Sequence, residues 1–170
     1  MMHGTVATEA TIRTGLDFEE FFGEHYGTLA AAMLLMSGDP AEAEDVAQEA
    51  MARVFERWSR VRAMDSAAGY LYRTAVNVYR SRLRRLAVRT RHLLAPPERD
   101  ELAASETRNE VLAMLGELPV AQRQALVLVE WLGLSAQEAG RALGIEAVSV
   151  RGRLHRARST MRERFGGDDA

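Results

Sequence analysis

The chain has 170 residues, a formal net charge of -2, 47% apolar residues and no cysteine. This length and composition fit one or two small globular domains, and the lack of cysteine excludes disulfides and thiolate metal or redox sites. The longest apolar run, Leu29 to Met36, is much shorter than the roughly 20 residues of a membrane helix, and the N-terminal residues show no export signal. We therefore expect a cytoplasmic protein without membrane insertion.

The charges are unevenly distributed along the chain. Up to Arg60 there are eleven acidic residues and four arginines. The stretches YRSRLRRLAVRTR, from Tyr79, and VRGRLHRARSTMRER, from Val150, contain six arginines each. The near-neutral total therefore conceals one acidic surface and two basic surfaces.

Apolar residues recur three and four positions apart almost throughout, and no stretch alternates with a period of two, so the pattern predicts an all-α protein. The first helix is expected from about Phe18 to Met36. Its predicted buried stripe consists of Phe18, Phe21, Phe22, Tyr26, Leu29, Met33 and Leu34.

A second helix is predicted from Pro40 to about Trp58. Asp39 supplies an N-cap, Pro40 occupies the first helical position, and Glu42 completes a capping box. The apolar positions Ala43, Val46, Ala47, Ala50, Met51, Val54, Phe55 and Trp58 should be buried. The opposite face carries the polar residues Glu42, Asp45, Gln48, Glu49 and Glu56.

A polar turn from Ser59 to Asp65 leads to Ser66, a predicted cap, and to a third helix that continues to about His92. Pro96 and Pro97 then interrupt the pattern and indicate a flexible linker. We therefore predict two small helical domains, residues 16–92 and 107–166, joined by a proline-containing linker of residues 93–106.

The second domain is predicted to contain helices near Thr107–Leu115, Pro119–Trp131, Ser135–Leu143 and Glu146–Phe165. Ser135 and Glu138 form a capping box, Gly140 is small where two helices meet, and Gly144 permits a tight turn. This spacing is typical of a helix-turn-helix.

The last helix has two different faces at about 100° per residue. Val150, Leu154, Ala157 and Met161 lie on the face toward the core, whereas Arg151 and Arg156 lie on the opposite face. A planar guanidinium can donate to both acceptors of guanine in the major groove, so this outward face favours DNA binding over a merely solvated surface.

Three blocks in succession resemble the extracytoplasmic-function class of bacterial RNA polymerase sigma factors: AEAEDVAQEAMARVFERW, AAGYLYRTAVNVYRSRLRR and ELPVAQRQALVLVEWLGLSAQEAGRALGIEAVSVRGRLHRAR. The resemblance extends from about Phe18 to Phe165. It implies a subunit that binds core RNA polymerase and promoter DNA, and members of the class are commonly held inactive by an anti-sigma factor. The residues implied to contact core polymerase are Asp45, Val46, Gln48 and Glu49.

The resemblance also implies contacts to both promoter elements. The −10 element would be bound, with one base extruded, by Arg60, Arg62, Asp65, Ser66, Tyr70, Tyr72, Arg73, Asn77, Arg80, Arg84 and Arg85. The −35 element would be bound by Val148, Ser149, Arg151, Gly152, His155 and Arg156. Aromatic rings stack on unpaired bases and arginines bind phosphates, although Tyr70 and Tyr72 also fit a role in core packing. DNA phosphate would supply the counter-charge for the arginines from Arg80 to Arg91.

The chain departs from the class at three positions. Tyr70 stands where tryptophan is usual, Ser81 where an acid is common, and Ala139 where a larger aliphatic residue is usual. The first two bear on −10 sequence preference, and the third indicates a looser C-terminal domain.

Two other classes of protein fit only part of this sequence. A dimeric helix-turn-helix regulator would need a dimer helix or ligand pocket upstream, and a sigma-mimicking decoy for an anti-sigma factor would lack the DNA-binding arginines. An enzyme is not expected, because the histidines lack metal-ligand spacing and no nucleotide-binding glycine loop is present. We predict no catalytic residues, no metal and no cofactor.

Overall fold

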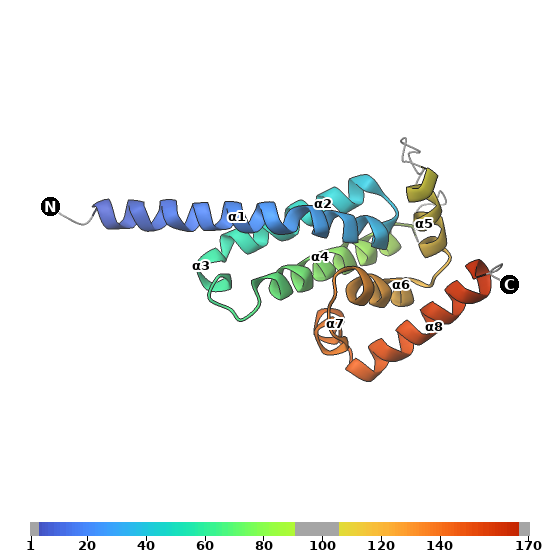
Figure 1. Ribbon diagram of the computed structural model, residues 1–170. Helices are drawn as coiled ribbons and strands as arrows, with labels where there is room; N and C mark the ends of the chain where they lie inside the picture. The colour runs from blue at the N-terminus through green and yellow to red at the C-terminus, as the bar shows by residue number, and fades with distance from the viewer. Residues whose placement is uncertain (1–3, 91–105, 167–170) are drawn as a thin grey trace.

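The computed structural model describes the backbone of residues 4–90 and 106–166 and the side chains of residues 17–89 and 108–166. Within these ranges the chain forms helices and no strands, which confirms the predicted all-α fold (Figure 1). In the same ranges, no helix has the length and apolar character needed to cross a membrane.

The N-terminal group of helices comprises α1 (Gly4–Ser37), α2 (Pro40–Glu56), α3 (Trp58–Val61) and α4 (Ala67–Thr90). Helix α1 begins at Gly4, well before Phe18, the predicted start, and no proline interrupts the residues between them. In Figure 1 its first turns extend beyond the other helices.

The predicted caps of this group are present. The Asp39 carboxylate accepts the backbone N–H of Ala41 at 2.9 Å, and the Ser66 hydroxyl accepts that of Gly69 at 2.9 Å. The capping-box role predicted for Glu42 is wrong, since its carboxylate instead binds Arg82 of α4 at 2.7 Å. These contacts fix where α2 and α4 begin and tie them together.

The predicted second helix is divided in two. Helix α2 ends at Glu56, and Trp58 starts the single turn of α3, where its indole packs 4.9 Å from the ring of Phe21. Two residues predicted to be buried are exposed: Phe22 is 39% exposed and Phe55 is 54% exposed. Phe21 and Trp58 are the aromatic residues buried at this end of the bundle, and Phe22 and Phe55 lie at its surface.

The C-terminal group comprises α5 (Glu106–Gly116), α6 (Val120–Leu126), the π-helical turn η1 (Val127–Trp131), α7 (Ala136–Leu143) and α8 (Ala147–Phe165). The helix predicted from Pro119 to Trp131 is therefore α-helical only in its first part. Its last turn is wider, and the Leu132 N–H donates to the Val127 carbonyl at 3.1 Å.

The helix-turn-helix predicted for α7 and α8 is confirmed. Ser135 and Glu138 form the capping box, with contacts of 3.2 and 2.8 Å. Gly144 has a φ of 68°, which favours glycine. A Cβ atom on Gly140 would lie 2.6 Å from the Ile145 carbonyl oxygen, so only glycine fits where the turn passes α7.

The two groups of helices pack against each other through α4 and α7 (Figure 1). Arg80 of α4 donates to the Leu143 carbonyl at the end of α7 at 2.6 Å. The Met36 carbonyl at the end of α1 accepts from Tyr79 and from Arg123 of α6, each at 3.1 Å. One buried apolar cluster includes residues of both groups. The predicted linker, residues 93–106, lies outside the described residues except for its last position, so the domain boundaries remain a prediction.

Candidate functional site

The polar face of α2 is directed away from the core. Asp45 and Gln48 are exposed and Glu49 is half-buried, whereas Val46 is fully buried. Val46 therefore packs in the core, and the surface available to a partner is formed by the three polar side chains.

Carboxylates of α2 surround one guanidinium of α4. Arg82 binds Glu42 in a bidentate manner at 2.7 and 2.9 Å, reaches Asp45 at 3.1 Å and lies 3.9 Å from Glu49. The hydrogen bond to Glu42 is the main cause that raises the pKa of Arg82 above its ordinary value. The acidic face of α2 is thus attached to the helix that carries the first arginine stretch.

The turn between α3 and α4 presents polar side chains to solvent. Arg62, Asp65 and Ser66 of this turn are exposed, and so is Arg60 in the last turn of α3. The Arg62 guanidinium lies 2.8 Å from the Asp17 carboxylate of α1, which holds this side of the turn against the bundle.

The two tyrosines of α4 have different environments. Tyr70 is half-buried, and its hydroxyl accepts a hydrogen bond from Arg57 at 3.1 Å. This hydrogen bond is the main cause that raises the pKa of Arg57. Tyr72 is buried with its ring edge-on to His25, and burial raises its pKa. Tyr72 therefore packs in the core, while Tyr70 remains at the surface.

Arg73 and Asn77 are exposed and four residues apart, so they share one face of α4. This face continues from the turn between α3 and α4. An amide beside a guanidinium offers both a base-edge partner and a phosphate partner to one nucleic-acid strand.

The arginines of the first basic stretch have different partners. Arg80 and Arg82 are engaged within the protein, so the prediction that DNA supplies the counter-charge is wrong for Arg82. Arg91 lies outside the described residues. A shallow groove of about 470 Å³ is lined by Ser81, Arg84, Arg85, Val88 and Arg89. Its three arginines are exposed.

Helix α8 has the two faces that its sequence predicts. Val150, Leu154 and Ala157 are buried. On the opposite side Val148 is 65% exposed and Ser149, Arg151, His155 and Arg156 are exposed as well. A Cβ atom on Gly152 would touch only the Arg156 guanidinium, at 3.6 Å, so the backbone is accessible there.

Two other arginines of α8 form ion pairs within the C-terminal group. Arg158 forms an ion pair with Glu130 of η1, and Arg164 forms one with Glu117 at the α5 terminus. The outward arginines, Arg151 and Arg156, form no ion pair with any described residue. The charge of the second basic stretch is therefore divided between packing and an open surface.

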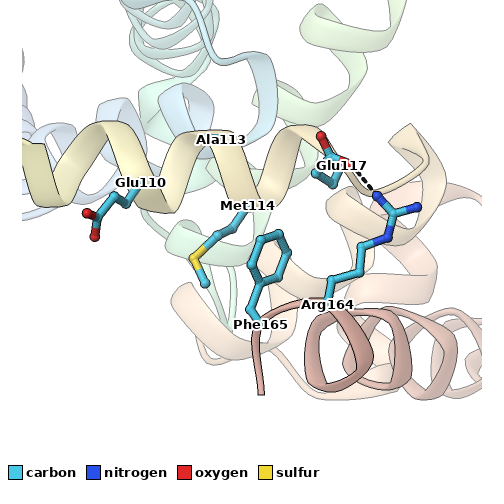
Figure 2. Close-up of a pocket in the computed structure, with 6 residues that line it drawn as sticks. All are labelled: Glu110, Ala113, Met114, Glu117, Arg164 and Phe165. Atoms are coloured by element: carbon cyan, nitrogen blue, oxygen red, sulfur yellow. Dashed lines mark hydrogen bonds and ion pairs between the residues drawn. The ribbon is translucent and has the colours of Figure 1, made fainter. Parts of the chain in front are cut away.

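A pocket of about 520 Å³ lies between α5 and the end of α8 (Figure 2). None of the residues predicted to bind polymerase or DNA lines it. Within the described ranges, no group of three His, Cys, Asp or Glu side chains is placed to hold a metal ion. The pocket is lined by Glu110, Ala113, Met114, Glu117, Arg164 and Phe165.

Comparison with known proteins assigns both groups of helices. Residues 21–89 match the model of Sigma-70 region 2, and residues 108–161 match the model of Sigma-70 region 4. The RNA polymerase sigma-E factor of Streptomyces coelicolor is 32% identical over 157 residues, which cover 91% of this chain and 89% of that protein. The ECF RNA polymerase sigma factor SigM of Mycobacterium tuberculosis is 32% identical over 154 residues, covering 88% of this chain and 77% of that protein.

The chain belongs to the extracytoplasmic-function class of RNA polymerase sigma factors. Sigma factors of this kind are transcription initiation factors rather than enzymes.

Solved structures show that the sigma factor shares its fold with others. The sigma factor RpoE of Bartonella quintana, in complex with the anti-sigma factor NepR, has a TM-score of 0.77 at 18% identity, covering 89% of this chain and 98% of that chain. CnrH, in complex with the cytosolic domain of CnrY, has a TM-score of 0.65 at 24% identity, covering 89% of each chain.

Sequence patterns did not identify every residue that shapes these surfaces in the sigma factor. Three such residues were missed. Asp17 pairs with the predicted contact residue Arg62, Arg57 donates a hydrogen bond to Tyr70, and Arg82 joins α4 to Glu42 of α2. The partner of Arg82, Glu42, is 40 positions away along the chain. No periodic spacing relates Glu42 to Arg82, and the packing of α2 against α4 brings them together.

Proposed function

We propose that this sigma factor binds core RNA polymerase through Asp45, Gln48 and Glu49 of α2 and directs promoter-specific transcription initiation. The turn of residues 60–66 and the exposed face of α4 contact the −10 element and help strand opening. The outward face of α8 contacts the −35 element. The polymerase supplies the catalysis, and the complex acts in the cytoplasm.

The observation that carries this proposal is the outward orientation of two arginine-bearing faces, one on α4 and one on α8. Each lies opposite a buried apolar stripe, so neither is needed for the core. Both faces can neutralise phosphate, and each carries groups that can reach a base edge: Asn77 on α4 and Arg151 on α8. Two DNA surfaces beside a separate acidic surface fit a two-element promoter factor.

An anti-sigma factor is the proposed negative regulator. RpoE of Bartonella quintana was solved in complex with the anti-sigma factor NepR. The shared fold supports an equivalent partner for this chain.

Run-off transcription with core RNA polymerase over a promoter library tests the proposal. We expect transcripts that depend on both the sigma factor and a defined pair of −10 and −35 sequences. A conventional helix-turn-helix regulator would bind duplex promoter without core polymerase and give no such transcripts. A decoy would bind an anti-sigma factor and neither DNA element.

A further inference from the structure

One side-chain hydrogen bond closes the segment that leads from α2 to α4. The Arg57 guanidinium donates to the Tyr70 hydroxyl at 3.1 Å, and the two residues are 13 positions apart in the chain. The residues between them form α3, the turn after it and the first residues of α4 (Figure 1). The bond therefore joins the C-terminal end of α2 to the first turn of α4.

The backbone is also held at both ends of this segment. The Arg57 carbonyl accepts the N–H groups of Arg60 at 3.0 Å and Val61 at 2.9 Å, which begins α3. The Tyr70 N–H donates to the Ser66 carbonyl at 3.2 Å. Because both backbones are fixed, the side-chain bond determines where the Tyr70 hydroxyl lies.

The hydrogen bond lies at the surface, whereas apolar side chains anchor α3 from within. Trp58 is 5% exposed and Val61 is fully buried. Arg57 is exposed, and Tyr70 packs only in part against the buried apolar cluster. The contact between the guanidinium and the hydroxyl is therefore not needed to close the core.

The Tyr70 side chain keeps two means of binding a nucleotide. A tyrosine hydroxyl that accepts one hydrogen bond can still donate its own hydrogen. The bond that it accepts comes from a charged donor, which is stronger than a neutral one and polarises the O–H group. Tyr70 thus offers a ring for stacking on an unpaired base and an O–H for an acceptor on the same strand.

Tyr70 shares a face of α4 with two residues of the proposed −10 surface. Tyr70, Arg73 and Asn77 are spaced by three and four positions, which places them in one row along the helix. The Tyr70 hydroxyl held by Arg57 therefore lies at the N-terminal end of this row, next to the turn between α3 and α4.

The surroundings of the Arg57 guanidinium favour a role through Tyr70 over a direct contact with phosphate. Glu56, the preceding residue, is exposed, and its negative charge interacts with Arg57. A carboxylate at this distance repels a phosphate group. The hydrogen bond to Tyr70 also directs the guanidinium toward the ring.

We propose that Arg57 is a positioning residue of the −10 surface, which holds the Tyr70 hydroxyl so that the ring stacks on an unpaired promoter base. This inference rests on the proposed function of α4. Arg57 acts through Tyr70, and the strand is bound by Tyr70, Arg73 and Asn77.

The test is a double-mutant cycle of Arg57→Ala and Tyr70→Phe, which keeps the ring and removes the hydroxyl. The affinity of each holoenzyme for a fluorescently labelled single strand, the non-template −10 strand of a promoter from the run-off library, is measured at several salt concentrations. The melting temperature and the core affinity of each variant are measured in parallel. Arg57→Lys is the conservative variant, and Arg108→Ala on α5 is the control that removes an exposed arginine in the other group of helices.

We expect Arg57→Ala and Tyr70→Phe each to raise the Kd for the single strand about fivefold, within the range for one lost hydrogen bond. The double variant should bind as the single variants do, because all three lack the same bond. Arg57→Lys should restore most of the affinity. The salt dependence of Arg57→Ala should match the wild type, because no phosphate contact is lost, and Arg108→Ala should bind like the wild type.

Two results would overturn the inference while leaving α4 as the −10 surface. If Arg57→Ala weakens binding equally in the Tyr70→Phe background and reduces the salt dependence, Arg57 binds phosphate directly. If folded Arg57→Ala binds normally and Asn77→Ala does not, Arg57 has no part in the site, and a lower melting temperature of Arg57→Ala would then mark a structural residue.

A different result would refute the proposed function of α4 itself. Holoenzymes that contain Arg57→Ala, Tyr70→Ala or Asn77→Ala would all bind the single strand normally. The inference about Arg57 would fail with it, because no −10 contact would remain for Arg57 to position.

Discussion

Individual arginines on α8 differ in what they contact, and this difference separates stability from recognition. Arg151 and Arg156 point away from the core, while Arg158 is paired with Glu130. Arg158 therefore serves as a control on the same helix for substitutions of Arg151 and Arg156.

We predict that Arg151→Ala or Arg156→Ala weakens binding to the −35 element by about 1 to 3 kcal/mol, the range for a good bidentate base contact. The measurement is holoenzyme binding to promoters with single base substitutions. Arg158→Ala is the control and should leave base selectivity unchanged. Unaltered selectivity in both outward variants would contradict the assignment.

Asn77 is exposed on α4 beside Arg73, which allows the loss of one amide without disturbing the core. We predict that Asn77→Ala impairs open-complex formation while duplex binding persists, because base-edge hydrogen bonds are lost and phosphate contacts remain. Permanganate footprinting of unpaired thymines measures the opening. A pre-melted −10 bubble should partly restore transcription. A large fall in folding stability with normal opening would instead mean a structural role.

At the scale of elements, the packing of α2 against α4 constrains how the acidic face can be tested. Asp45 and Glu49 lie within 3.1 and 3.9 Å of Arg82. A lysine at either position would face Arg82 and lower stability by repulsion, so neutral substitutions isolate the effect on the partner better.

We therefore predict that Asp45→Asn with Glu49→Gln weakens core polymerase binding and leaves helicity intact, since both side chains lie off the apolar stripe. Co-purification and titration with core enzyme measure the loss. Glu110→Gln on α5 is an exposed control. Normal assembly of the double variant would exclude α2 as the docking helix.

The capping box of α7 links the stability of the helix-turn-helix to pH. The backbone N–H of Ser135 donates to the Glu138 carboxylate and is the main cause that lowers the pKa of Glu138 below its ordinary value of 4.5. Because the folded pKa is lower than the unfolded one, the stabilisation is present above pH 4.5 and is lost as pH falls through the folded value.

We predict that Glu138→Gln lowers the free energy of unfolding at neutral pH and that this difference shrinks in acid. Ser135→Ala should cost about 1 kcal/mol, typical of a lost N-cap. Urea unfolding across pH measures both effects. A difference between wild type and Glu138→Gln that grows in acid would contradict the assigned direction of the pKa change.

At the scale of the whole molecule, the two groups of helices are packed together, with Arg80 of α4 bonded to α7. The −10 and −35 elements are about 25 base pairs apart, or about 85 Å at about 3.4 Å per base pair. A folded chain of this length has a radius of gyration of about 15 Å. While α4 and α7 are packed together, the DNA-binding faces of α4 and α8 cannot contact both promoter elements at once. Promoter binding therefore requires the two groups of helices to separate.

We predict that the distance between α3 and α7 increases when the holoenzyme binds a promoter. The chain has no cysteine, so Ser59→Cys and Gln137→Cys provide two unique labelling positions. Energy transfer between the dyes should fall from the free sigma factor to the complex. Arg123→Ala removes the hydrogen bond to Met36 and should lower the transfer in the free protein too. Equal transfer in the free and promoter-bound states would contradict the required separation.

The sequence by itself determined the all-α fold, the caps at Asp39, Ser66 and Ser135, and the two faces of α8. The capping box at Ser135, the glycine turn at Gly144 and the buried stripe of α8 were all predictable, because each depends on residues within a few positions of one another. The division of α2 from α3 and the wide turn of η1 were missed, since both depend on how neighbouring helices pack.

Only the tertiary structure decided which predicted surface residues are available. Helical phase places Phe55 and Tyr72 on apolar stripes or near them, but the space between helices leaves Phe55 exposed and buries Tyr72. Arg82 belongs to a run of arginines that suits DNA, yet it binds carboxylates of α2 that lie far away in the chain. Local pattern fixes the direction of a side chain on its own helix, whereas its contacts depend on which other helix lies opposite.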